Sequence, residues 1–254
     1  MDVLVSSAGG IATIALDRPA KKNAITAPMY QAMADALRAA DADGAVRCIV
    51  IHGTSEAFTA GNDLEDFLKH PPQDESAPVF RFMAAIAGCT KPLVAAVAGP
   101  AVGVGTTMLL HCDLVYAGDN ARFALPFSQL ALCPELASSL LLPMLAGHQR
   151  AAEKLMLGEP FGAEEAREMG LVNKVLPAAE TIPHALAQAA KLTRLPASSL
   201  RATKRLMRSG LGAAIAQRMG EENDQFRAML TAPEAREAFT AFLEKRKPDF
   251  SKFG

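Results

Sequence analysis

Two glycine turns follow apolar segments that are typical of buried strands, and each turn leads into a predicted helix. The first is FTAGNDL, residues 58–64, and the second is GPAVGVG, residues 99–105. Backbone amides at a helix start have no partner within the helix, so they can donate to a ligand oxygen. Two such amides converging on one oxygen would form an oxyanion hole, which stabilises developing negative charge. The alternative for the first segment is an ordinary strand-to-helix turn.

A glutamate, Glu135, follows a proline in the apolar segment ALCPELASSLLLP. A carboxylate held among Leu132, Leu136 and Leu140 would have its ionised form disfavoured, which moves its pKa toward the range of a general base. The alternative is a first-turn charge that interacts favourably with a helix dipole. The sequence leaves both interpretations open.

Other reaction classes have weaker support in the sequence. The second turn lacks the third glycine of a dinucleotide fingerprint, because Met108 occupies that place, and no Walker-type phosphate loop or GxSxG nucleophile elbow occurs. The four cysteines form no CxxC pair, and the five histidines have no metal-binding spacing. We therefore expect no metal site, and buried reduced thiols rather than disulfides.

Composition points to a small-molecule substrate. The chain has 254 residues, 50% of them hydrophobic, which is enough for a large core. Its 26 basic and 27 acidic residues nearly cancel, so no overall field would attract nucleic acid or an anionic membrane. The N-terminal segment does not have the pattern of a signal peptide, and no long apolar run occurs. We expect a soluble, cytoplasmic protein.

Strands and helices alternate around these turns. Alternating apolar residues on both sides of Gly9 and Gly10 predict an opening β-hairpin, and Thr26 is the expected cap of the following helix. RCIVIHG, PLVAAVAG, DLVYAG and LVNKVL are predicted strands, and TTMLLHC a predicted helix. Further helices are expected after Asp63, from about residue 79, and over residues 135–146. The pattern predicts an α/β core.

From Ile182 onward the sequence shows only helical periodicity, with Met and Phe at spacings of three and four. Such a stripe fits either packing onto the chain's own core or a subunit interface. Both interpretations stay open at this point.

Four segments in series resemble the enoyl-CoA hydratase/isomerase, or crotonase, superfamily. They are LDRPAKKNAIT, FTAGNDL, GPAVGVGTTMLLHCDLVYAGDNARFALPFSQLAL and GEPFGAEEAREMGLVNKVLP. The family's fold is a spiral of ββα units with a helical C-terminal region, usually assembled as trimers or pairs of trimers. The resemblance thus implies an α/β crotonase-like spiral over residues 1–181 with an acyl-CoA site, a helical oligomerisation region over residues 182–254, and no cofactor besides the coenzyme A of the substrate.

The resemblance also assigns site residues. The two oxyanion amides fall on Asn62 and Val104, whose roles belong to the backbone and do not depend on the side chain. Positions expected to bind substrate are Lys22, Asn23, Ala60, Gly61, Asp63, Gly103, Thr107 and Phe127.

The acid/base positions distinguish reactions within the family. Hydratases carry two glutamates, and their positions are occupied here by Thr107 and Phe127. Glu135 instead matches the acidic position of members that shift a double bond, and the chain looks like the peroxisomal-type Δ3,Δ2-enoyl-CoA isomerases. The resemblance implies that Glu135 moves a proton in the conversion of 3-enoyl-CoA to trans-2-enoyl-CoA.

Three alternatives remain at the level of sequence. One is hydration by a variant arrangement, and another is different enolate chemistry at Glu135, such as dehalogenation. The third is a non-catalytic trimer that binds acyl-CoA or RNA, with RATKRLMRSG from Arg201 as a local basic patch. The near-neutral net charge argues against RNA.

Overall fold

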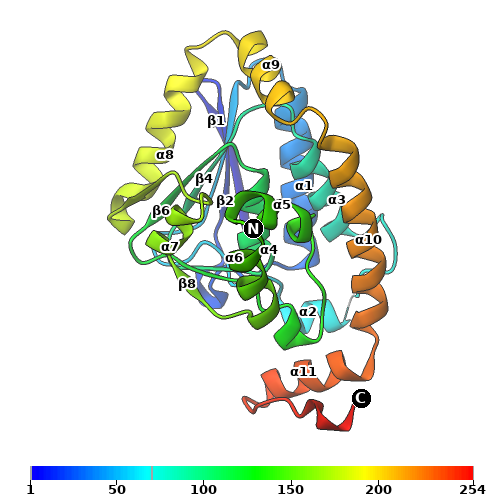
Figure 1. Cartoon of the computed structure of the whole chain (residues 1–254). Coiled ribbons are helices and arrows are strands. Elements are labelled where there is room, and N and C mark those ends of the chain that lie inside the picture. Colours follow the sequence, from blue (N-terminus) through cyan, green and yellow to red (C-terminus); the bar gives the residue numbers. More distant parts are fainter. Residues whose placement is uncertain (1, 70, 254) are drawn as a thin grey trace.

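The computed structural model describes residues 2–69 and 71–253, and a six-stranded sheet lies at its centre (Figure 1). Its strand order is β1-β2-β3-β4-β6-β9; β1 and β2 form the predicted antiparallel hairpin, and the other neighbours are parallel. The strands are β1 Val3–Ala8, β2 Ile11–Leu16, β3 Cys48–His52, β4 Leu93–Val97, β6 Leu114–Gly118 and β9 Lys174–Leu176.

Helices cover both faces of this sheet. On one face α1 (Ala27–Ala42) and α3 (Pro78–Gly88) pack together, and α8 (Ala178–Thr193) covers the other (Figure 1). Successive residues of a strand point to opposite faces, so Ile49 joins the main core while Val50 packs in the cluster under α8. This two-sided burial explains why the parallel strands are apolar without alternation.

A second, three-stranded sheet contains the segment that follows β4. It consists of β5 (Pro100–Val102), β7 (Arg122–Ala124) and β8 (Phe161–Gly162), in the order β5-β7-β8. The mixed α/β class expected from the sequence is confirmed.

One local expectation is confirmed in position only, and another was wrong. Helix α1 begins after Thr26 as predicted, but the Thr26 side chain makes no capping hydrogen bond; instead the Asp66 carboxylate accepts from the Ala27 amide at 2.7 Å. The helix expected over TTMLLHC is a single turn, α4 (Val104–Thr107), that continues as a 3₁₀ turn over Met108–His111.

The helix expected to start at Glu135 starts later. Helix α5 spans Ser138–Ala146, and Glu135 lies in the turn before it. Leu136 and Ala137 both have left-handed backbones, with φ of 58° and 55°. This conformation costs about 1–2 kcal/mol for each residue with a Cβ, so neighbouring groups must hold the turn in place. Glu135 is therefore not a first-turn helix charge.

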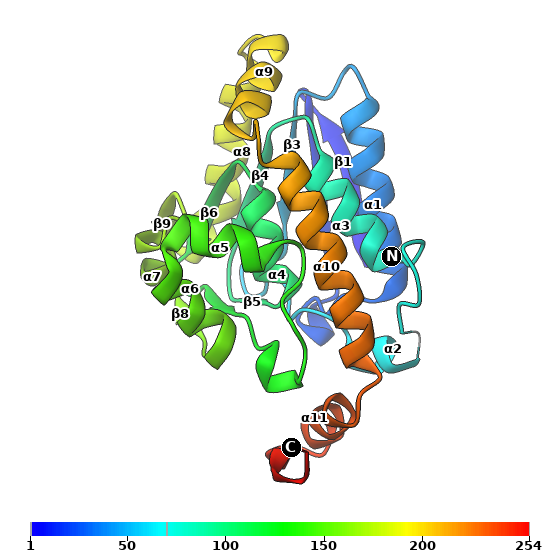
Figure 2. The ribbon, with the colours of Figure 1, turned by 45° about the vertical axis from the view of Figure 1, so that its right-hand side comes forward.

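The C-terminal helices continue the same core. The predicted boundary after residue 181 falls inside α8, and α9 (Ala197–Met207), α10 (Gly212–Leu230) and α11 (Pro233–Leu243) follow. Figure 2 shows α10 running along the molecule toward α2 (Leu64–Lys69), with α11 beyond it. Phe226 and Phe239 belong to the main core, so part of the apolar stripe packs within the chain. Two further short α-helices are α6 His148–Ala152 and α7 Ala163–Glu168.

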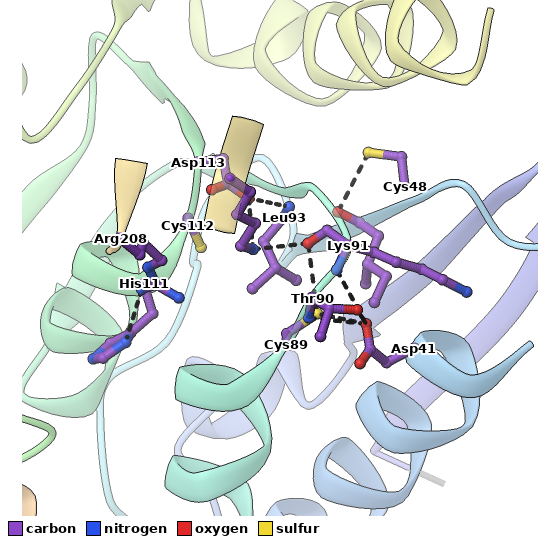
Figure 3. A network of polar contacts seen from close by, with 12 residues as sticks. Asp41, Cys48, Cys89, Thr90, Lys91, Leu93, His111, Cys112, Asp113 and Arg208 are labelled. Carbon is purple, nitrogen blue, oxygen red and sulfur yellow. Dashed lines mark hydrogen bonds and ion pairs between the residues drawn. The ribbon is translucent and has the colours of Figure 1, made fainter. Parts of the chain in front are cut away.

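A buried polar network attaches α9 to the core. The Lys204 Nζ donates to the Asp113 carboxylate and to the Lys91 carbonyl, both at 2.7 Å. Figure 3 shows Lys91 and Asp113 in this network, together with Arg208, which contacts His111. Two cations of the predicted basic patch, Lys204 and Arg208, thus bind groups of the protein itself. No helix among residues 2–69 and 71–253 is both long and apolar enough to cross a bilayer.

Candidate active site

The two glycine turns lie side by side. The Thr59 amide donates to the Pro100 carbonyl at 2.9 Å, and the Val102 amide donates back to the Thr59 carbonyl at 3.1 Å. Gly61 follows with a φ of +86°, and a Cβ built on it would lie 2.8 Å from the Val102 carbonyl oxygen. Only glycine fits both this backbone conformation and this close approach.

Each turn contains a backbone amide that takes no part in this pairing. Within the described part of the chain, neither the Asn62 nor the Val104 amide donates to another protein group, whereas their neighbours Asp63 and Gly103 do, to Ile25 and Ala124. Val104 is the first residue of α4, so its amide belongs to the unpaired set at a helix start. These are the two donors assigned from the sequence.

A cavity of about 730 Å³ opens beside the turns. Gly61, Asn62 and Gly103 line one side of it, and Glu135 lies in its wall. The remaining wall is largely apolar and includes Phe67, Phe127, Leu130, Leu132, Phe226, Phe239, Phe242 and Phe250. A cavity with few polar groups strengthens any charge interaction made inside it.

Glu135 is the buried carboxylate of this cavity. Its side chain is 3% exposed, and its Oε1 has no hydrogen-bond partner among the described residues. Burial, and next the negative charge of Glu222, raises the pKa of Glu135 to about 8. Loss of water destabilises the ionised form, so this carboxyl group holds and releases a proton near neutral pH.

Tyr30 connects α1 with the first turn. Its hydroxyl donates to the Asn62 side-chain oxygen. Burial, and then the charge of Glu135, raises the pKa of Tyr30 well above its ordinary value, which keeps the phenol protonated. No sequence pattern singles out Tyr30, because its position on α1 among buried apolar residues such as Met29 and Met33 indicates only packing.

The structure brings most of the predicted site residues together. The cavity is lined by Ala60, Gly61, Asn62, Asp63, Gly103, Phe127 and Glu135. Val104 is fully buried directly after Gly103. Lys22, Asn23 and Thr107 are not among the lining residues; Thr107 is buried, and its hydroxyl contacts the Val104 carbonyl at 3.5 Å.

Asn23 and Asp63 hold the loop beside the cavity. The Asn23 amide nitrogen donates to the carbonyls of Ala57 and Phe58, and its oxygen accepts from the Arg18 amide at 2.7 Å. Asp63 accepts from the Arg18 guanidinium at 2.7 Å. These contacts connect the loop before α1 to the segment that contains the first turn.

We expect Asn23→Ala to lower the free energy of unfolding by about 1–3 kcal/mol, because three backbone groups lose a buried partner. Since Asn23 lies behind the cavity wall, KM for an acyl-CoA should change less than stability does. Chemical denaturation and steady-state kinetics on the same sample check this. A large rise in KM at unchanged stability would show instead that Asn23 contacts substrate.

Several cavity residues come from the last two helices. Phe226 lies on α10, and Phe239 and Phe242 lie on α11. The spacing of these phenylalanines predicted that one face of each helix is buried, but it did not indicate which part of the protein that face covers. No group of three or more potential metal ligands occurs within residues 2–69 and 71–253.

The family profile described as enoyl-CoA hydratase/isomerase matches residues 6–252. The rat protein "Enoyl-CoA delta isomerase 2" is 37% identical over 252 residues, which are 97% of this chain and 64% of that protein. The 2,3-dehydroadipyl-CoA hydratase of Escherichia coli K12 is 32% identical over 252 residues and 98% of each chain. Both isomerases and hydratases are therefore similar to this sequence.

Two solved structures share the whole fold. Pseudomonas aeruginosa OdaA superimposes with a TM-score of 0.93 at 47% identity, over 95% of this chain and 98% of that one. An enoyl-CoA hydratase/isomerase from Pseudoalteromonas atlantica T6c gives a TM-score of 0.95 at 38% identity, over 99% and 100% of the two chains. The spiral α/β fold and these matches show that the chain is an enzyme of the enoyl-CoA hydratase/isomerase family.

Proposed function

We propose that this enzyme shifts the double bond of a 3-enoyl-CoA to give the trans-2-enoyl-CoA. The observation that carries the proposal is Glu135, a buried carboxylate with an unpartnered oxygen, in the wall of the cavity that is also lined by Asn62 and by Gly103, the residue before Val104. The two positions where hydratases of this family carry glutamates hold Thr107 and Phe127 instead.

The reaction needs a base and a site for negative charge. The thioester oxygen of the substrate accepts hydrogen bonds from the Asn62 and Val104 amides, which makes the α-proton acidic enough for Glu135 to remove. The charge spreads over a dienolate. Glu135, now protonated, returns the proton to the γ-carbon, so one carboxyl group serves both steps and the substrate's atoms and charge are conserved.

The rest of the cavity suits such a substrate. Phe127 and the other apolar side chains exclude water, which disfavours addition across the double bond. Two exposed lysines in the cavity lining, Lys21 and Lys247, offer cations for the phosphates of a coenzyme A.

Product analysis tests the proposal. Incubation with matched 3-enoyl and 2-enoyl thioesters should give a product of unchanged mass with a moved double bond. A product heavier by one water would instead show that the enzyme is a hydratase, in line with its second set of relatives.

The pH dependence of kcat/KM should follow the ionisation of Glu135. A base must be deprotonated to act, so kcat/KM should rise with pH, with a midpoint near the pKa of about 8, and then level off. Initial rates between pH 6 and 9.5 measure this. A midpoint near 4.5 would show that the catalytic carboxylate is not desolvated.

We also propose that the enzyme is a homotrimer or a dimer of trimers. Part of the C-terminal apolar stripe stays uncovered, because Leu206, Met207 and Phe242 are exposed. Burial of these side chains between subunits would stabilise an assembly. Light scattering at micromolar concentration should give a mass of three or six chains, and a monomeric mass would refute this expectation.

A further inference from the structure

The turn after Glu135 depends on groups outside itself. Leu136 and Ala137 are consecutive left-handed residues, a conformation that side chains with a Cβ adopt only when the surroundings enforce it. Any movement of this turn would move Glu135 relative to the two free amides. The groups that hold the turn therefore control the geometry of the proton transfer.

Glu222 of α10 binds one side of this turn. Its carboxylate accepts from the Ala137 amide at 2.6 Å, the Ser139 amide at 3.0 Å and the Ser139 hydroxyl at 2.5 Å. Glu222 thereby caps the N-terminus of α5, because the N-cap residue of this helix makes no side-chain capping bond. The Glu222 side chain is buried, and the nearby Arg218 donates to the Ser139 hydroxyl at 3.2 Å.

His111 binds the other side. Its Nε2–H donates to the Leu136 carbonyl at 2.9 Å. Its Nδ1 accepts from Arg208 at 3.3 Å (Figure 3), and the two contacts together fix the tautomer. Burial lowers the pKa of His111 to about 4, so this ring is neutral and adds no charge near Glu135 at working pH. The turn is held from opposite sides by α10 and by the 3₁₀ turn after α4.

The two carboxyl groups near the turn, Glu222 and Glu135, have different surroundings. Burial raises the pKa of Glu222 above its ordinary value, but its three donors and the Arg218 cation oppose this rise, whereas Glu135 Oε1 has no partner among the described residues. The ionised form is therefore better stabilised at Glu222. Tyr30 and Cys133 also face the pair; burial raises the pKa of both, to about 11 for Cys133, so both stay protonated.

We propose that Glu222 is a positioning residue for Glu135: it holds the backbone turn that carries the base and places a fixed negative charge beside it. This rests on the proposed role of Glu135 as the base. Glu222 does not line the cavity and has no contact with substrate in the proposed mechanism.

Glu222→Gln tests the charge. An amide keeps the size but loses the charge, so the midpoint of the kcat/KM–pH profile should move about one pH unit toward acid. The plateau kcat should also fall. The carboxylate of Glu222 has two oxygens that accept from three donors of the turn, whereas the glutamine side chain has only one oxygen to accept from them. Asp224→Asn is the matched control: it removes an exposed charge that pairs with Arg227 on the same helix, and its profile should equal that of wild type. An unchanged midpoint in Glu222→Gln would overturn the proposal.

Glu222→Asp tests the effect of side-chain length separately from the effect of the negative charge. It keeps the charge but shortens the side chain, so the midpoint should stay near that of wild type while the plateau kcat falls. If the glutamine variant does not fold, a wild-type kcat in the aspartate variant overturns the proposal. The wild-type profile and the activity of Glu135→Gln test the proposed base independently, so failure of that role is distinguishable from failure of the role of Glu222.

Discussion

Glu135→Gln is expected to lower kcat for the isomerisation by about 10²- to 10⁴-fold. Glutamine has the same size and fits the same turn, but it cannot take a proton from the α-carbon. KM should change little, because the advantage of a base appears mainly in the transition state. Rates with a 3-enoyl-CoA at the plateau pH measure the effect, and near-normal turnover in this variant would rule out the proposed mechanism.

The same variant has an expected stability effect with a defined sign. The folded-state pKa of Glu135, about 8, lies above its ordinary value of 4.5, so between these two pH values the unfolded chain is ionised while the folded chain still holds its proton. Wild-type stability attributable to this group is therefore complete below pH 4.5 and falls as pH rises toward 8. Glu135→Gln should lack this fall, which urea unfolding at pH 5 and pH 8 would show. If the Glu135 carboxyl group were exposed to solvent, wild type and Glu135→Gln would show the same change in stability between pH 5 and pH 8.

Gly61→Ala is expected to lower kcat by about 10²-fold, the usual cost of losing one oxyanion donor. The new Cβ would lie 2.8 Å from the Val102 carbonyl oxygen, so one of the two turns must shift. That shift separates the Asn62 and Val104 amides, which must converge on one oxygen. Steady-state kinetics should show the loss mainly in kcat.

Gly9→Ala is the matched control for this substitution. Gly9 also has a positive φ, +59°, but it lies in the hairpin turn and its Cβ would contact nothing within 4 Å. Its alanine variant should lose about 1 kcal/mol of stability and keep wild-type kcat. If the two variants had equal kcat, the approach of the two turns would have no role in catalysis.

Local sequence patterns were sufficient to predict the core elements and the two turns. The hairpin at Gly9 and Gly10 and the apolar strands depend on neighbouring residues, and the structure has them where expected. A free amide at Val104 could also be anticipated, because unpaired amides at a helix start are a property of the helix itself, whereas Asn62 lies two residues before α2 and was assigned only by the family resemblance. The proposal that Glu135 is the acid/base residue needed the family resemblance as well.

Interactions between distant segments were not predictable in this way. Thr26 looked like a cap, but Asp66, from a different helix, provides the carboxylate. Glu135 looked like the first residue of a helix, but contacts of its turn with His111 and Glu222 favour the left-handed conformation and delay the helix. A periodic stripe likewise predicts that Phe226 is buried without saying that it borders the cavity.

The origin of the cavity wall has a consequence for synthesis of the chain. Ribosomes add residues from the N-terminus, so both glycine turns and Glu135 emerge before α10 and α11. Until those helices dock, Glu222 cannot hold the turn after Glu135, and the side of the cavity formed by Phe226 and Phe239 stays open to water. We expect a nascent chain stopped before α10 to contain every residue assigned to the proposed chemistry and yet to lack both the Glu222 contact and the cavity wall that the chemistry needs.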